Sequence, residues 1–163
     1  MSTPTREATI EAVKDLPVIR ITREFDAPAE KVFRAHTDRD LFARWIGPRS
    51  IDTTITEWDA RTGGRYAYRN TRAEDDLDAG FYGSFHEVRP NERIVQTFTW
   101  EGAPDGVSLE TMTFEELPGG RCRIVGTSVV ETVELRDMIL SSGMDVGVNE
   151  GYEKLDELLA AGL

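Results

Sequence analysis

The sequence predicts one α+β domain in which a C-terminal helix covers an antiparallel sheet. Between residues 51 and 131, apolar residues alternate with polar ones, and turn residues interrupt the alternation at short intervals, which is typical of antiparallel strands joined in order. Between residues 132 and 163 the apolar period becomes helical. This stripe advances by four, four, three and four residues through Met144, Val148, Tyr152, Leu155 and Leu159.

The N-terminal part of the chain is predicted to begin with an arm and a strand. A length of 163 residues fits a single domain with one core. Residues 1–16 are polar and lack a clear period, so we expect a loosely ordered N-terminal arm before a domain that spans residues 17–163. The first strand is predicted at Val18–Phe25, where β-branched and charged residues alternate.

Two short helices are predicted after this strand. Residues 26–30 form a helix-start signal, because a proline lies near the first turn and acidic residues favour the positive end of the helix. Apolar positions continue through residues 32–45 with a break at Thr37-Asp38, which can cap the second helix. Gly47-Pro48 ends the pair.

Six further strands are predicted, which makes seven in all. Short turns separate them, so they form a meander of antiparallel neighbours whose curved inner face needs the C-terminal helix as its cover. The six strands are expected at residues 51–58, 64–72, 79–89, 93–101, 107–117 and 121–131.

Gly143, Gly147 and Gly151 form a second stripe in the C-terminal helical segment. Each glycine inside a helix costs about 0.5 to 1 kcal/mol relative to alanine, so a benefit must offset the cost. Two compatible explanations are open: the helix backbone approaches the sheet closely, or the glycines leave room for a ligand.

Composition excludes several classes of function. With 30 acidic and 19 basic residues the formal charge is −11, which repels nucleic acids and anionic membranes, and no basic patch overrides it. A single cysteine, Cys122, forms neither an internal disulfide nor a thiolate metal cluster. No signal peptide or membrane span is evident, so we expect a soluble cytoplasmic protein without nucleic-acid or membrane partners.

Four segments in a fixed order resemble the bacterial proteins that are similar to the C-terminal domain of the activator of the ninety-kilodalton heat-shock protein ATPase. That family belongs to the START-like, or SRPBCC, superfamily. The resemblance covers about residues 17–161. The segments are APAEKVFRAHTD at 27–38, RWIGPRS at 44–50, GSFHEVRPNERIVQTFTW at 83–100 and SGMDVGVNEGYEKLDELL at 142–159.

The resemblance implies a helix-grip fold, in which a curved seven-stranded sheet wraps round a long C-terminal helix. It also implies a cavity between them that receives an apolar small molecule in many relatives. It does not imply one activity, because lipid carriers, hormone receptors and polyketide-type aromatic cyclases share the scaffold.

Aromatic and methionine side chains are the candidate lining of such a cavity. Several lie at alternate positions of one strand, as Tyr66 and Tyr68 do, and therefore share a face of the sheet. Filling of the core is the alternative explanation for any one of them. The predicted ligand-binding set is Trp45, Tyr66, Tyr68, Phe98, Trp100, Met112, Met144, Val148 and Tyr152.

His36, His86 and Glu110 are the candidate polar groups of the cavity. His36 stands where relatives often carry an aromatic residue, and it either titrates at the cavity mouth or is half-buried and bonded to a neighbour. His86 shares a face with Ser84, but no nucleophile turn or oxyanion loop accompanies the pair, so we expect no catalytic relay.

No metal or cofactor is predicted. Two distant histidines and one cysteine do not make a closed metal site, and the acidic run at residues 74–78 lacks the ligand order of a calcium loop. The paired glycines at 63–64 and 119–120 lie between strands, so they indicate hairpin turns instead of phosphate-binding loops.

Three functions remain open from the sequence. The first is binding of an unidentified apolar or aromatic small molecule in the cavity. The second is association with a chaperone through the protein surface, as the resemblance implies. The third is a cyclase or hydrolase activity that uses a cavity histidine or Glu110 for proton transfer. A homodimer is also an open possibility.

Overall fold

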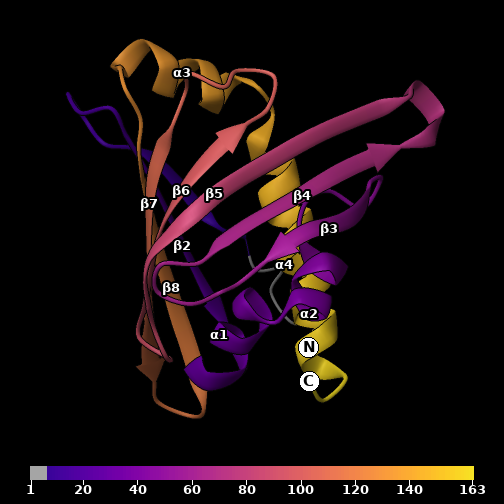
Figure 1. Cartoon of the computed structure of the whole chain (residues 1–163). Coiled ribbons are helices and arrows are strands. Elements are labelled where there is room, and N and C mark those ends of the chain that lie inside the picture. The colour runs from indigo at the N-terminus through magenta and orange to yellow at the C-terminus, as the bar shows by residue number, and fades with distance from the viewer. Residues whose placement is uncertain (1–6) are drawn as a thin grey trace.

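The computed structural model describes residues 7–163, which form an eight-stranded antiparallel sheet and four α-helices (Figure 1). The strand order across the sheet is β1-β2-β8-β7-β6-β5-β4-β3, so β3 to β8 form a meander and β2 joins it beside β8. The strands are β1 Thr9–Ala12, β2 Val18–Phe25, β3 Asp52–Trp58, β4 Arg65–Arg72, β5 Leu77–Arg89, β6 Arg93–Trp100, β7 Ser108–Leu117 and β8 Arg121–Val129. This arrangement confirms the predicted α+β class and the meander.

The strand count differs from the seven predicted, because Thr9–Ala12 pairs with β2 as an edge strand. This segment lies within the predicted arm, and its residues are mostly exposed, so no alternation of apolar side chains marks it. Arg136 holds the turn that follows, since its guanidinium donates to the carbonyl oxygens of Val13 and Leu16. Residues 1–6 of the predicted arm lie outside the described residues.

The two short helices, α1 Ala29–Thr37 and α2 Arg39–Trp45, form where the sequence predicts them. Asp38 ends the first and caps the second, because its Oδ1 accepts hydrogen bonds from the backbone N–H groups of Asp40 and Leu41 at 3.0 and 3.1 Å. Asp38 thus joins the two helices directly, and α2 packs against the C-terminal helix.

The C-terminal segment is two helices instead of one, α3 Val133–Ser141 and α4 Met144–Ala160. Gly143 separates them with a φ of 86°, a left-handed conformation that glycine adopts without strain. Gly143 is therefore at a helix boundary and not inside a helix. In Figure 1, α4 lies along the inner face of the curved sheet, with α3 at one end of that face and α1 and α2 at the other.

Gly151 explains one part of the predicted glycine stripe. A Cβ atom at this position would lie 3.1 Å from the carbonyl oxygen of Trp45 and 3.4 Å from the backbone of Gly47. The close approach is thus between α4 and the end of α2, and not between the helix and the sheet. Gly147 has more room, since its nearest neighbour is Pro48 at 3.5 Å.

The hydrophobic core occupies the half of the inner face that α1 and the C-terminal part of α4 cover. Phe25, Ile124 and Leu155 are fully buried there. Edge-to-face contacts join Phe33 to Phe114 and Phe25 to Tyr152, with ring centroids 5.3 and 5.4 Å apart. This end of the domain is close-packed, and Tyr152 lies where the packed core meets the cavity described below.

Candidate functional site

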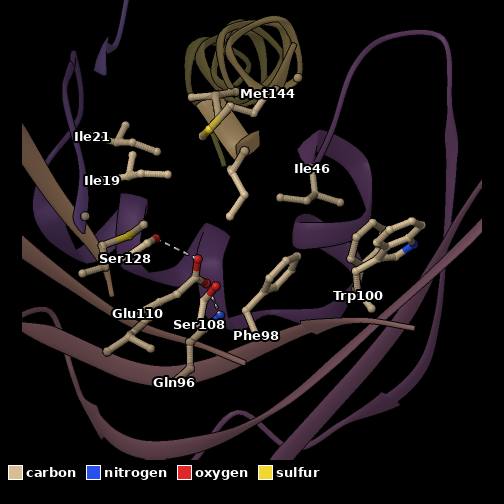
Figure 2. Close-up of a pocket in the computed structure, with 18 of the residues that line it drawn as sticks. Ile19, Ile21, Ile46, Gln96, Phe98, Trp100, Ser108, Glu110, Ser128 and Met144 are labelled. Carbon is tan, nitrogen blue, oxygen red and sulfur yellow. Dashed lines mark hydrogen bonds between the residues drawn. The ribbon is translucent and has the colours of Figure 1, made fainter. Parts of the chain in front are cut away.

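A cavity of about 580 Å³ lies between the inner face of the sheet and the helices (Figure 2). All strands except β1 contribute to it, together with each of the four helices. Trp100 and Val107 belong to its lining and are 50% and 53% exposed, so the cavity opens to solvent beside the connection between β6 and β7. Its walls are mostly aliphatic and aromatic side chains.

Small residues on the inner face leave this space. Along β8 the inward positions run from Ile124, which is fully buried, through Gly126 to Ser128. A Cβ atom at Gly126 would make only ordinary contacts, the nearest at 3.8 Å. Gly147 of α4 also lines the cavity. The loss of side-chain volume along β8 and α4 therefore opens the cavity where the core ends.

A polar row crosses the floor of the cavity. Gln96, Glu110 and Ser128 are direct cross-strand neighbours on β6, β7 and β8, so their side chains share the inner face. Ser128 Oγ donates a hydrogen bond to Glu110 Oε2 at 3.1 Å, and Gln96 Nε2 donates to Glu110 Oε1 at 3.4 Å. Figure 2 shows both bonds as dashed lines. The row holds the carboxyl group in one orientation.

Tyr66 extends this network to β4. Gln96 Nε2 donates to the Tyr66 hydroxyl oxygen at 3.2 Å, and that hydroxyl donates to the carbonyl oxygen of Thr97 at 2.6 Å. Burial raises the pKa of the Tyr66 and Tyr152 phenols, so both stay neutral hydroxyls. Both residues line the cavity.

Glu110 is a carboxyl group in an apolar environment. Burial raises its pKa, and the hydrogen bonds from Ser128 and Gln96 oppose that rise in part. Among the described residues that line the cavity it is the one carboxylate, and none of them is lysine or arginine. The site thus carries one acidic group without a lysine or arginine partner in the described cavity wall.

His36 is buried and bonded, which is one of the two states that the sequence left open. Its Nδ1 donates to the carbonyl oxygen of Val32 at 2.7 Å, and its ring packs edge-on against Trp45 and Phe114. Burial lowers the pKa of His36 to about 4, although the bond to Val32 acts in the opposite direction. Nε2 has no partner within residues 7–163 and is covered by protein atoms, so this group does not titrate at the cavity mouth.

The structure brings most of the predicted set together. His36, Glu110 and eight of the nine predicted lining residues lie in the cavity wall: Trp45, Tyr66, Phe98, Trp100, Met112, Met144, Val148 and Tyr152. Tyr68 is the ninth and lies in the core instead, with its ring 5.4 Å from Phe42 and 5.3 Å from Phe81. His86 is exposed on β5 and does not reach the cavity.

The sequence reasoning missed several members of the wall. Gln96 and Ser128 are the important ones, because they orient Glu110. Gln96 could have been found from the alternation, since it lies two residues from Phe98 on the same strand. Ser128 required the register between β7 and β8, which no local pattern gives.

Within residues 7–163, no group of three histidine, cysteine or acidic side chains lies close enough to hold a metal ion. None of the helices in that part of the chain combines the length and apolar character needed to cross a membrane.

Comparison with known proteins identifies relatives over most of the chain. The family model described as Activator of Hsp90 ATPase homolog 1-like protein matches residues 26–160. No curated protein matches the chain.

Solved structures of bacterial proteins share the fold. A protein from Rhodobacter sphaeroides aligns with a TM-score of 0.85 and 24% identity over 95% of this chain and 99% of its own. A protein from Mycobacterium smegmatis aligns with a TM-score of 0.83 and 25% identity over 93% of this chain and 96% of its own. A protein from Chromobacterium violaceum aligns with a TM-score of 0.75 and 28% identity over 86% of this chain and 96% of its own.

Proposed function

We propose that this chain, which belongs to the Activator of Hsp90 ATPase homolog 1-like family, binds an apolar or aromatic small molecule in the cavity between its sheet and α4. The observation that carries the proposal is the cavity itself. Its volume of about 580 Å³ falls within the range of about 300 to 1,000 Å³ typical of small-molecule sites. In this interpretation the fold acts as a START-like helix grip, with the sheet and α4 closing on the ligand.

The chemistry of the wall supports the same function. Protein interiors are close-packed, so an unfilled void of this size lowers stability, and a ligand that fills it restores the lost contacts. The wall combines many apolar side chains with a few polar groups, here the row of Gln96, Glu110 and Ser128. A few oriented polar groups in an apolar wall are the usual way in which a pocket selects its ligand.

Native mass spectrometry of the freshly purified protein, compared with the same sample denatured, tests the proposal. We expect a noncovalent mass that is lost on denaturation. A titration with the neutral fluorophore N-phenyl-1-naphthylamine gives an independent measure, because its emission rises in an apolar environment.

The matched variants are Gly126→Leu and Val125→Leu. Gly126→Leu places a side chain in the cavity, so we expect it to reduce fluorophore binding at least tenfold. Val125 is the neighbouring residue on β8, where the side chain points to the opposite face, and Val125→Leu should bind as the unchanged protein does. Absence of both a co-purified mass and saturable binding, or equal binding by the two variants, would refute the proposal.

An enzyme that transfers a proton is the second candidate, because Glu110 places a carboxyl group of raised pKa inside the cavity. His36 and His86 do not support it, since the first is covered and the second is outside. If mass spectrometry identifies a bound compound, NMR of that compound during incubation with the protein shows whether it is converted. Conversion that Glu110→Gln abolishes would favour the enzyme, and an unchanged compound would exclude this reaction.

A further inference from the structure

Among the side chains of the described cavity wall, Glu110 has the only carboxyl group, and no lysine or arginine accompanies it. The chain has 19 lysine and arginine residues, yet none of those described lines the cavity. A ligand with a carboxylate or phosphate would therefore meet an acidic group and no cation in the wall. This distribution of charge disfavours fatty acids and other anionic lipids as occupants.

The carboxyl group of Glu110 has unused acceptor capacity. An ionised carboxylate has about four acceptor positions on its two oxygens. Within residues 7–163, Ser128 donates to one oxygen and Gln96 to the other, at 3.1 and 3.4 Å. Both donors reach the carboxyl group from the neighbouring strands on either side, because they are its cross-strand neighbours. The remaining positions are left for a donor that enters from the cavity (Figure 2).

Aromatic rings line the same cavity as Glu110. Trp45 and Tyr152 line the cavity with their rings stacked at 5.8 Å, and Phe98 lines it from β6. The faces of such rings attract cations, most strongly when water is excluded. Tyr66 and Tyr152 are near enough to Glu110 for its negative charge to raise the pKa of their phenols.

We infer that the ligand is an apolar amine, bound with its ammonium group paired to the Glu110 carboxylate and its apolar body against the aromatic wall. This inference rests on the proposed small-molecule function and names the chemical class of its ligand. An ammonium group supplies both the missing charge and the hydrogen-bond donor, and Gln96 and Ser128 keep the carboxylate oriented toward it.

Three probes with one aromatic body test the inference: 2-(1-naphthyl)ethylamine, 2-(1-naphthyl)ethanol and 1-naphthylacetic acid. Isothermal titration calorimetry at pH 7 gives their affinities. We expect the amine to bind about ten to a hundred times more tightly than the alcohol, because a hydrogen bond to a charged group is stronger than a neutral one. The acid should bind more weakly than either.

Two variants assign the preference to one carboxylate. Glu110→Gln should bind the alcohol as tightly as the unchanged protein does. Its affinity for the amine should then differ from its affinity for the alcohol by no more than about threefold. Glu115→Gln removes the same charge from the opposite face of β7, where Glu115 is exposed and pairs with Arg123 at 3.3 Å. This control should keep the full preference for the amine.

A pH series on the unchanged protein gives a test that needs no variant. Protonation of Glu110 removes the pairing, so affinity for the amine should fall as the pH drops toward 4, while affinity for the alcohol should not. His36 is neutral above about pH 4, and Tyr66, Tyr68 and Tyr152 are neutral hydroxyls at these pH values. Arg23 contacts Tyr152 from the core and pairs with Asp156.

The outcomes separate this inference from the proposed function. Equal binding of amine and alcohol, tighter binding of the acid, or a preference that survives Glu110→Gln would overturn the amine and leave a small-molecule site. Failure of all three probes and of the neutral fluorophore would overturn both. If Glu115→Gln loses the preference for the amine as fully as Glu110→Gln does, the preference comes from the net charge of the protein, and the role of Glu110 is overturned.

Discussion

Along β7, Phe114 is buried against Phe33, whereas Glu110, four residues nearer the start of the strand, faces a cavity. The same sheet face is thus solid at one end and hollow at the other. The helices show the same division, since Leu155 of α4 is fully buried and Met144 lines the open end. The solid half specifies the fold, and the hollow half is free to carry a ligand.

The largest expected effect contrasts the two halves of α4. Leu155→Ala should lower the free energy of unfolding by about 2 to 5 kcal/mol, because it leaves a new void among fully buried side chains. Met144→Ala should lower it by less than about 1.5 kcal/mol, since this side chain already borders empty space. Urea denaturation measures both values. Equal losses would show that the two halves are packed alike.

His36, which packs on Phe114 where the solid half meets the cavity wall, makes the fold sensitive to acid. Its pKa is about 4 in the folded protein and near 6.5 in the unfolded chain, so the unfolded state binds more protons between these values. The stability that depends on neutral His36 is fully present above pH 6.5 and is lost as the pH falls toward 4, by about 3 kcal/mol.

His36→Phe should remove most of this loss, which urea denaturation between pH 7 and 4 would measure. His86→Phe is the matched control, because His86 is exposed on β5, and it should keep the pH dependence of the unchanged protein. A profile for His36→Phe that is as steep as that of the control would contradict the assignment to His36.

Glu110 has the opposite dependence in the hollow half. Burial raises the pKa of Glu110 in the folded protein above its ordinary value of 4.5. The stability that depends on a protonated Glu110 is therefore fully present below pH 4.5 and is lost as the pH rises through the folded pKa. Glu110→Gln should therefore stabilise the protein at pH 7, and the gain should shrink as the pH falls. Thermal unfolding across pH 4 to 8 measures this.

Glu115→Gln, on the exposed face of β7, is the control and should show no such gain. If Glu110→Gln instead destabilises the protein at pH 7, the carboxylate stabilises the fold, and the expected cost of burying its charge is contradicted.

The solid half was easier to predict from the sequence than the hollow half. Local signals placed the strands of the meander, the Asp38 cap and the class of fold, because alternation and capping depend on neighbouring residues. The edge strand Thr9–Ala12 was missed because it is held by backbone pairing and by Arg136. The helix boundary at Gly143 was also missed. Gly143 continues the four-residue spacing of the glycine stripe, and that spacing does not reveal its left-handed φ.

The site depended on long-range register. Alternation put Tyr66 and Tyr68 on one face of β4 but could not tell which of them Phe42 and Phe81 would cover. Ser128 and Gln96 meet Glu110 through the alignment of three strands, which turns and twist set together. Which polar side chains converge was therefore decided by tertiary structure.

The smallest expected effect is a gain of up to about 1 kcal/mol in stability for Gly126→Leu. A Cβ atom at Gly126 would have no neighbouring atom closer than 3.8 Å. Leucine therefore fits there, and it both restricts the unfolded chain and buries apolar surface in the cavity. Val125→Leu should change the free energy of unfolding by less than about 0.5 kcal/mol. A gain in stability together with lost fluorophore binding would mean that the hollow half is kept open at the expense of stability, as expected for a binding site. A loss of more than about 1 kcal/mol would mean that the void cannot accept a side chain at this position.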